Sequence, residues 1–316
     1  MKNFALIGAA GYIAPRHMKA IKDTGNNLIA ALDISDSVGI IDSYFPNARF
    51  FTEFERFDRH IDKIYRKNPK SSADLISICS PNYLHDAHVR FAFRSGADAI
   101  CEKPMVLNPW NLDALQEIEA STGRRVFNIL QLRLHPSLIQ VKKEIDASNN
   151  ENKYEVDLTY ITSRGKWYLS SWKGDESKSG GIATNIGVHF FDMLSWLFGD
   201  LQRNEVHLYT QQKSSGYLEY KKARVRWFLS IDESDLPQSC QEKDQRTHRS
   251  ISIDNKEIEF SGGFTDLHTE SYKQILDGEG FGCDDARVAI QTVHDIRNTK
   301  INVNPSTLHP FAAKKL

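Results

Sequence analysis

The first 130 residues alternate short apolar runs with amphipathic segments, the pattern of consecutive β–α–β units. The apolar runs predict buried strands at 4–8, 28–33, 74–80, 99–102 and 126–130. The amphipathic segments predict helices at 15–24, 84–95 and 111–122. Crossover helices cover both faces of a parallel sheet. Residues 1–130 are therefore expected to form a doubly wound α/β domain with a parallel sheet.

The pattern changes after a predicted helix at 136–147 and a polar stretch at 148–152. Beyond it, apolar and polar positions alternate with period two, typical of strands with one face exposed or facing a partner. Strands are predicted at 154–162, 206–210, 223–231, 248–253 and 257–260, and helices at 187–198, 266–276 and 284–299. The polar residues 233–246, which include Pro237, are predicted to form a loop. Residues 131–316 are thus expected to form an α+β domain with a large, mostly antiparallel open sheet.

Composition and charge narrow the class of protein. The chain has 316 residues, with 40 basic and 41 acidic side chains, and is long enough for two domains. This balance provides no basic surface for a nucleic acid, and no apolar run is as long as a membrane span. The N-terminus lacks the layout of a signal peptide, and the four cysteines lie far apart without metal-ligand spacing. We expect a soluble, cytoplasmic protein with no metal site.

A glycine-containing loop, Gly8-Ala9-Ala10-Gly11-Tyr12-Ile13-Ala14, joins the first predicted strand to the first helix. Small residues there let the backbone approach a pyrophosphate, whose charge the helix N-terminus stabilises. The first glycine spacing is one residue longer than in the usual dinucleotide motif. The alternative to a binding loop is a tight turn with a purely structural role.

The second strand ends at Asp33, 22 residues after Gly11. This carboxylate can bind both ribose hydroxyls and repel a 2′-phosphate, which favours NAD over NADP; the alternative is a solvated turn residue.

Two further predicted strands end in polar residues, Cys79-Ser80-Pro81-Asn82-Tyr83-Leu84-His85 and Cys101-Glu102-Lys103-Pro104. The carboxyl ends of parallel strands line the ligand crevice of such a sheet. Asn82 there can flank a nicotinamide or cap the next helix. A partly buried Lys103 amine beside an oxidised nicotinamide would have a lowered pKa and could accept the proton of a substrate hydroxyl. The alternative is a surface lysine before a turn.

The second half contains one segment with candidate catalytic chemistry, Ser179-Gly180-Gly181-Ile182-Ala183-Thr184-Asn185-Ile186-Gly187-Val188-His189-Phe190-Phe191-Asp192. Asn185 and His189 are four residues apart, so they share one face of a helix. Asp192 is placed to orient the His189 imidazole. The alternative is a histidine with a purely structural role.

Four motifs follow in order: Gly8-x-x-Gly11-x-Ile13-Ala14-x-x-His17, Ser80-Pro81-Asn82-x-x-His85, Glu102-Lys103-Pro104 and Gly180-Gly181…Gly187-x-His189-x-x-Asp192. This set resembles the glucose–fructose oxidoreductase/inositol dehydrogenase/MocA-type family. The resemblance implies an N-terminal Rossmann domain that binds NAD. It also implies a C-terminal domain that binds substrate and whose open sheet packs against other subunits, in a homodimer or homotetramer. Lys103 and His189 are the implied catalytic residues, near the nicotinamide and the reacting sugar carbon.

Within the family, the segments 5–18, 154–165 and 183–189 resemble the UDP-N-acetyl-D-glucosaminuronate 3-dehydrogenases of bacterial O-antigen (lipopolysaccharide) synthesis. That subgroup oxidises the sugar 3-hydroxyl to a ketone with NAD and can regenerate NAD with 2-oxoglutarate. Asn185 stands where many family members carry Asp, so His189 or Lys103 must act as the base. The expected NAD-binding residues are Gly8, Gly11, Tyr12, Ile13, Asp33, Ser80, Pro81, Asn82, His85, Glu102 and Lys103.

A cluster of basic and aromatic residues at 164–178 fits the anions of such a substrate. Arginine and lysine bind phosphate and carboxylate, and aromatic faces can stack on a base or sugar; the alternative is a solvated basic rim. The expected substrate-binding residues are Lys103, Arg164, Trp167, Lys173, Asn185 and His189. Three other functions stay open: a family enzyme acting on a free sugar or inositol, a non-catalytic NAD-sensing regulator, and a structural subunit.

Overall fold

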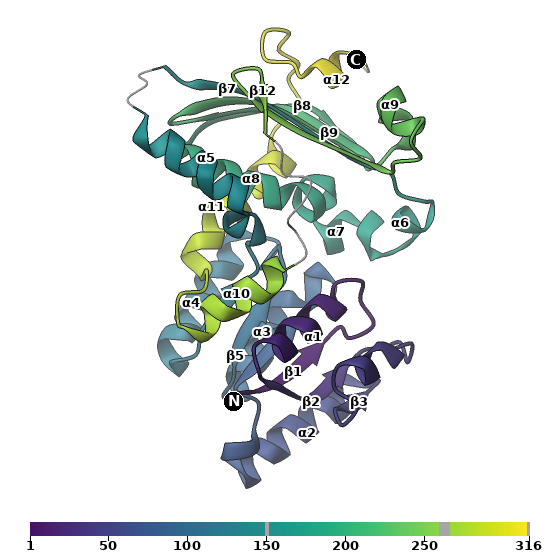
Figure 1. The fold of residues 1–316 in the computed structure, drawn as a ribbon, viewed down its shortest axis with the longest axis vertical. Helices are drawn as coiled ribbons and strands as arrows, with labels where there is room; N and C mark the ends of the chain where they lie inside the picture. The colour runs from purple at the N-terminus through teal and green to yellow at the C-terminus, as the bar shows by residue number, and fades with distance from the viewer. Residues whose placement is uncertain (149–151, 259–265, 315–316) are drawn as a thin grey trace. The chain divides into compact units, whose positions relative to one another are not determined.

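The computed structural model describes residues 1–148, 152–258 and 266–314, which divide into two units (Figure 1). The first unit consists of Met1–Gln131 and Thr265–Arg287, and the second of Leu132–Phe264 and Val288–Leu316. Each unit contains one six-stranded sheet.

The sheet of the first unit is entirely parallel, in the order β3-β2-β1-β4-β5-β6. Its strands are β1 (Asn3–Ile7), β2 (Asn27–Leu32), β3 (Arg49–Phe51), β4 (Leu75–Ile78), β5 (Asp98–Cys101) and β6 (Val126–Asn128). The helices of this unit are α1 (Ala14–Asp23), α2 (Phe54–Lys67), α3 (His85–Arg94), α4 (Pro109–Thr122) and α10 (Leu267–Leu276), with the short η1 (Gly39–Ser43), η2 (Pro69–Ser71) and η3 (Asn82–Leu84). The predicted doubly wound fold is confirmed. The strand order reverses between β1 and β4, and ligands of such sheets bind at that point, beyond the strands' carboxyl ends.

Helix α10 joins the first unit, although the sequence analysis assigned all residues from 131 to 316 to the second domain. The structure corrects that assignment for the segment that carries α10 and extends to Arg287. Tyr272 and Ile275 of α10 are buried in the same hydrophobic cluster as Phe4 and Met18. Helical periodicity shows that α10 has an apolar face, but it does not show which core that face covers.

The sheet of the second unit has the order β12-β11-β7-β10-β9-β8 and is antiparallel except between β7 and β10. Its strands are β7 (Tyr154–Thr162), β8 (Leu201–Tyr209), β9 (Lys213–Tyr220), β10 (Ala223–Ser230), β11 (Thr247–Ile253) and β12 (Lys256–Glu257). The predicted, mostly antiparallel sheet is confirmed. For the strand predicted at 257–260, residues 259 and 260 lie outside the described residues.

Helices cover both faces of this second sheet: α5 and α8 lie on one face and α12 on the other (Figure 1). The remaining helices of the described residues are α5 (Pro136–Ala147), α6 (Trp167–Ser170), α7 (Glu176–Ser179), α8 (Val188–Phe198), α9 (Gln238–Gln241), α11 (Cys283–Asn298) and α12 (Pro310–Ala313), with η4 (Gln131–Leu134), η5 (Trp172–Gly174), η6 (the π-helical Ala183–Gly187) and η7 (Glu233–Asp235). Phe191 of α8 packs edge-to-face on Trp227 of β10, with ring centroids 5.2 Å apart. Across the described residues, none of the helices combines the length and hydrophobicity needed to cross a membrane.

The predicted loop at 233–246 is corrected in part, because it contains η7 and α9. The Asp232 carboxylate accepts a hydrogen bond from the Ser234 amide at 2.9 Å and starts η7. Pro237 immediately precedes α9, where its fixed φ suits a helix start. Polar composition alone does not distinguish such single turns from a loop.

Candidate active site

The glycine loop after β1 has no room for a side chain at Gly8. Gly8 has φ +90°, and a Cβ atom built on it would lie 2.6 Å from the Cys79 carbonyl carbon and 2.8 Å from the Ser80 nitrogen. The end of β1 thus approaches the end of β4 so closely that only glycine fits. Tyr12 is exposed, Ile13 is half-buried, and α1 begins at Ala14. A glycine loop followed by a helix N-terminus fits the pyrophosphate of NAD.

Asp33, just after β2, is held beside this loop. Its Oδ2 accepts a hydrogen bond from the Ala10 amide at 2.9 Å, and its Oδ1 accepts one from the Ser35 amide at 2.9 Å. The half-buried carboxylate therefore braces the loop and has further lone pairs for ribose hydroxyls. Its predicted contact with NAD fits this position.

His85 connects the two other strand-end segments. Its Nδ1 lies 2.7 Å from the Pro104 carbonyl oxygen and its Nε2 lies 2.8 Å from that of Ser80. Burial lowers the pKa of His85, although both carbonyl partners act in the opposite direction. A neutral imidazole has one N–H and donates to one carbonyl at a time. His85 thus holds the segments that follow β4 and β5 together. The contacts of His85, Pro81 and the buried Asn82 with NAD stay predictions.

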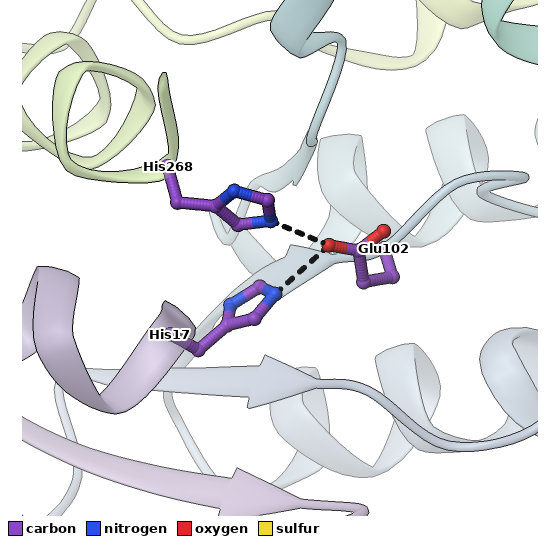
Figure 2. Close-up of side chains that lie close together, drawn as sticks. All are labelled: His17, Glu102 and His268. Atoms are coloured by element: carbon purple, nitrogen blue, oxygen red, sulfur yellow. Dashed lines mark hydrogen bonds and ion pairs between the residues drawn. The ribbon is translucent and has the colours of Figure 1, made fainter. Parts of the chain in front are cut away.

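Glu102, predicted to bind NAD, has its carboxylate in a buried cluster with two histidines from distant elements (Figure 2). Its Oε1 lies 3.0 Å from His17 Nε2 on α1 and 3.0 Å from His268 Nε2 on α10. Burial lowers the pKa of His17. Burial alone would raise the pKa of Glu102, but the hydrogen bonds from the two histidines hold it well below its usual value. The arrangement is therefore a carboxylate that accepts from two N–H donors.

This cluster also has a donor set known from zinc sites, because one ligand atom from each residue lies within 4.8 Å of the others. The sequence predicted no metal site. Both 3.0 Å contacts have the length of ordinary N–H···O hydrogen bonds. We interpret His17, Glu102 and His268 as a hydrogen-bonded cluster. His268 was not predicted as part of the site, since no local sequence motif surrounds it.

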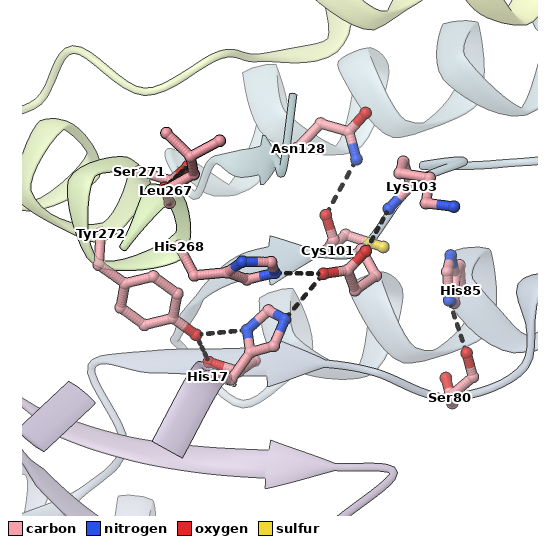
Figure 3. Close-up of polar contacts among 12 residues, drawn as sticks. His17, Ser80, His85, Cys101, Lys103, Asn128, Leu267, His268, Ser271 and Tyr272 are labelled. Carbon is pink, nitrogen blue, oxygen red and sulfur yellow. Dashed lines mark hydrogen bonds and ion pairs between the residues drawn. The ribbon is translucent and has the colours of Figure 1, made fainter. Parts of the chain in front are cut away.

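Lys103 directly follows Glu102 and is half-buried, with a cis peptide bond to Pro104. Its backbone N–H donates to Glu102 Oε2 at 3.3 Å, and its side chain extends away from His17 (Figure 3). The Pro104 carbonyl is the one that contacts His85. The segment that presents the Lys103 amine is thus braced on both sides.

In the second unit, Asn185 on η6 and His189 on α8 are half-buried, whereas their immediate neighbours in sequence are buried. Their common half-burial is consistent with the shared helix face that their spacing predicted, which stays a prediction. The Asn185 amide donates to the Tyr168 hydroxyl at 2.6 Å. Burial raises the pKa of Tyr168, which keeps the phenol protonated near neutral pH. Tyr168 is therefore a further candidate site residue, which the sequence analysis placed only in the aromatic cluster.

Asp192 forms a buried ion pair with Arg133, with Arg133 Nη2 2.7 Å from Asp192 Oδ1 and Nε 3.1 Å from Oδ2. The sequence analysis did not identify Arg133 as a partner, because it lies 59 positions away. The suggestion that Asp192 orients His189 stays a prediction.

The predicted anion-binding residues gather around the tryptophans of α6 and η5. The Lys173 amine lies 4.4 Å from the ring centroid of Trp172 and 5.5 Å from that of Trp167. Burial, and then the nearby charge of Arg164, lower the pKa of Lys173. The Trp167 ring is in turn 5.8 Å from that of Tyr168. Arg164, Trp167, Lys173 and Asn185 therefore form one local neighbourhood, linked through Tyr168.

The candidate catalytic residues come from different units: Lys103 belongs to the first and His189 to the second. Their convergence on one substrate stays a prediction.

Residues 2–129 match the oxidoreductase family with an NAD-binding Rossmann fold, and residues 152–234 match its C-terminal alpha/beta domain. The chain therefore belongs to the glucose–fructose oxidoreductase/inositol dehydrogenase/MocA family of oxidoreductases, as its motifs predicted. Its first unit is an NAD-binding domain.

Two crystal structures of the WlbA (WbpB) dehydrogenase from Thermus thermophilus are 51% and 50% identical in sequence to this chain. Both have a TM-score of 0.94 and cover 98% of this chain and 100% of their own. One is a complex with NAD and alpha-ketoglutarate, and the other is a complex with NAD and UDP-GlcNAcA. The WlbA dehydrogenase from Bordetella pertussis shares the fold at 19% identity, with a TM-score of 0.73 over 95% of this chain and 97% of its own.

Curated relatives match over shorter regions. The inositol 2-dehydrogenase of Rhizobium meliloti is 29% identical over 202 residues, which cover 62% of this chain and 55% of the relative. The glucose-6-phosphate 3-dehydrogenase of Bacillus subtilis is 27% identical over 217 residues, 63% of this chain and 54% of the relative. The chain thus matches about half of the length of these two relatives.

Proposed function

We propose that this protein oxidises the 3-hydroxyl of UDP-N-acetyl-D-glucosaminuronate (UDP-GlcNAcA) to the 3-keto sugar, with NAD as the oxidant. The observation that carries the proposal is the 50% identity, over 98% of the chain, to a dehydrogenase crystallised with NAD and UDP-GlcNAcA. The glycine loop and Asp33 supply a dinucleotide site, and the neighbourhood of Arg164 and Lys173 supplies positive charge for an anionic sugar nucleotide.

The chemistry needs a base, because hydride leaves a carbinol readily only as its hydroxyl loses a proton. Bound NAD supplies the hydride acceptor. His189 is the first candidate to take the proton, and the Lys103 amine would hydrogen-bond the same oxygen and stabilise its developing charge, or exchange roles with His189. Asn185 has no carboxylate that could accept the proton, so its role in this proposal is to orient the substrate, with its amide hydrogen-bonded to the Tyr168 hydroxyl.

The direct test is incubation of the purified protein with UDP-GlcNAcA and NAD, with and without 2-oxoglutarate, followed by mass analysis of the sugar nucleotide. The expected product has lost two hydrogens, one from C3 and one from its hydroxyl. UDP-N-acetylglucosamine, which lacks the carboxylate, is the matched control and should react poorly. Oxidation of free sugars or inositol in place of UDP-GlcNAcA would overturn the substrate assignment. Failure to reduce NAD with any sugar would favour an NAD-sensing regulator.

Several further features belong to the same proposal. 2-Oxoglutarate would reoxidise bound NADH, since a relative binds alpha-ketoglutarate together with NAD. The protein would act in the cytoplasm, as a homodimer or homotetramer, in the synthesis of O-antigen sugars. A second candidate function, oxidation of another sugar or of inositol, is favoured by the curated relatives that act on inositol and on glucose-6-phosphate.

Replacing Asp33 with Ala is expected to raise the Kd for NAD by about 10- to 100-fold, because hydrogen bonds to a charged group contribute about 1.5–3 kcal/mol. The Kd for NADP should rise less, since the carboxylate that repels a 2′-phosphate is gone. Titration calorimetry with both cofactors measures the two values. Asp33→Asn, which retains an acceptor for the Ala10 amide, separates loop bracing from ribose binding. An unchanged preference for NAD over NADP would contradict the assignment.

Replacing Lys173 with Met is expected to raise the KM for UDP-GlcNAcA with a smaller effect on kcat, because the ammonium binds an anion that does not react. The lowered pKa of Lys173 means that its charge is lost at a lower pH than that of an ordinary lysine. The wild-type KM should therefore rise as pH increases into the alkaline range, and Lys173→Met should abolish this rise. Steady-state kinetics across pH measures both effects. Lys221→Met, which removes an exposed lysine of the second unit outside the 164–178 cluster, is the control.

A further inference from the structure

A chain of hydrogen bonds within the first unit joins α10 to the residue before Lys103 (Figure 3). It consists of Ser77 Oγ–Tyr272 Oη at 2.6 Å, Tyr272 Oη–His17 Nδ1 at 2.8 Å, His17 Nε2–Glu102 Oε1 at 3.0 Å, His268 Nε2–Glu102 Oε1 at 3.0 Å and Lys103 N–Glu102 Oε2 at 3.3 Å. The side chains of Ser77, Tyr272, His17, His268 and Glu102 are all buried. This series of hydrogen bonds brings together four segments that are far apart in the sequence.

The direction of each bond follows from the ionised state of Glu102. A carboxylate only accepts, so His17 Nε2 and His268 Nε2 must both carry hydrogen. A neutral His17 then has a bare Nδ1, which accepts from the Tyr272 hydroxyl. Tyr272 in turn accepts from Ser77. Each atom in this series of hydrogen bonds is therefore fixed as either a donor or an acceptor, and this holds Glu102 in one orientation.

One atom of the cluster argues against a role limited to packing. His268 Nδ1 is buried and has no hydrogen-bond partner among the described residues. Leaving a buried polar atom unpaired costs free energy, which an apolar side chain at this position would avoid. The benefit that offsets this cost is the N–H that His268 directs at Glu102.

We propose that His268, together with His17, is a positioning residue: it fixes the Glu102 carboxylate, and through it the backbone of Lys103, so that the Lys103 amine is correctly placed for the reaction. The inference rests on the proposed function and deepens it. The carboxylate uses one oxygen for the two histidines and the other for the Lys103 N–H. Helix α10, which follows the second sheet in the sequence, thereby becomes part of the catalytic apparatus of the NAD-binding unit.

The test compares His268→Leu, which lacks the donor, with His268→Gln, whose amide restores an N–H near the same place. Small displacements of a catalytic group lower rates strongly, so His268→Leu should reduce kcat by about 10- to 100-fold. The KM for UDP-GlcNAcA and the Kd for NAD should stay near the wild-type values, and His268→Gln should recover most of kcat. Ser271→Ala is the matched control, because Ser271 is buried on the same helix and its hydroxyl donates to Leu267 O within α10, away from Glu102.

A second measurement does not depend on turnover. The rate of reductive methylation of the Lys103 amine, followed by mass spectrometry with NAD bound, should change in His268→Leu and return toward the wild-type rate in His268→Gln. The exposed Lys67 serves as the internal reference. If wild-type protein does not oxidise UDP-GlcNAcA, the proposed function fails, while the methylation rates still decide the positioning role.

Three results would overturn the inference. In the first, His268→Leu lowers Tm but leaves kcat and the Lys103 methylation rate unchanged, which indicates packing alone. In the second, NAD affinity falls as much as kcat, which indicates a cofactor-binding role. In the third, the purified protein holds one zinc ion per chain that a chelator removes with loss of activity, which indicates that the cluster binds metal.

Discussion

Replacing Lys103 with Met is expected to lower kcat by about 10²–10⁴-fold, the range for loss of a positioned acid–base group. Methionine retains much of the length and volume of the side chain but cannot hydrogen-bond the substrate oxygen or stabilise its charge. NAD affinity should change little, because the glycine loop and Asp33 lie on other segments of the same unit. Stopped-flow measurement of nicotinamide reduction gives the rate of the chemical step.

The control for this variant is Lys67→Met, which removes an exposed lysine from the end of α2 in the same unit. It should react at the wild-type rate. His189→Asn is measured in parallel to distinguish the two candidate bases. Loss of the base should lower the rate and also remove the dependence of the rate on pH. The variant that shows both effects therefore identifies the base. Near-normal turnover in Lys103→Met would remove Lys103 from the mechanism.

Replacing Arg133 with Met is expected to lower the free energy of unfolding by about 3–5 kcal/mol, the usual cost of leaving one partner of a buried ion pair uncompensated. Asp192 is 2% exposed and Arg133 is 11% exposed, so water cannot replace the lost guanidinium. The double variant Arg133→Met/Asp192→Asn should recover part of the loss, because the buried charge is then absent. Urea denaturation of the three proteins measures these differences.

Arg226 provides the matched control for this ion pair. It makes the same two-bond contact with Asp157, at 2.6 Å for both bonds, but at 40% and 31% exposure. Arg226→Met should therefore cost less than about 1 kcal/mol, because exposed ion pairs contribute little. Equal losses in the free energy of unfolding for Arg133→Met and Arg226→Met would show that burial does not determine how much the Arg133–Asp192 ion pair contributes to stability.

Sequence periodicity did not predict two strands, β3 and β9. Strand β9 was missed because Ser214, Ser215 and Gly216, which follow its first residue, are buried but small. A Cβ at Gly216 would lie 2.8 Å from the Trp227 ring, so the neighbouring strand requires glycine there. β3 was missed because it is only three residues long.

The sequence by itself determined the class of fold, the glycine loop and the strand-end residues Asp33 and Lys103. These features are local: strands and helices have their own periods, and the carboxyl ends of parallel strands share one edge of the sheet. The i to i+4 spacing likewise predicts one shared face for Asn185 and His189.

Only the tertiary structure decided the partners of these residues. His268 is 166 positions from Glu102, and Arg133 is 59 positions from Asp192. A helix pattern states which side chains face a core, but packing between distant segments determines which core it is. For that reason α10 was assigned to the wrong domain, and the histidine that it brings to Glu102 could not be foreseen.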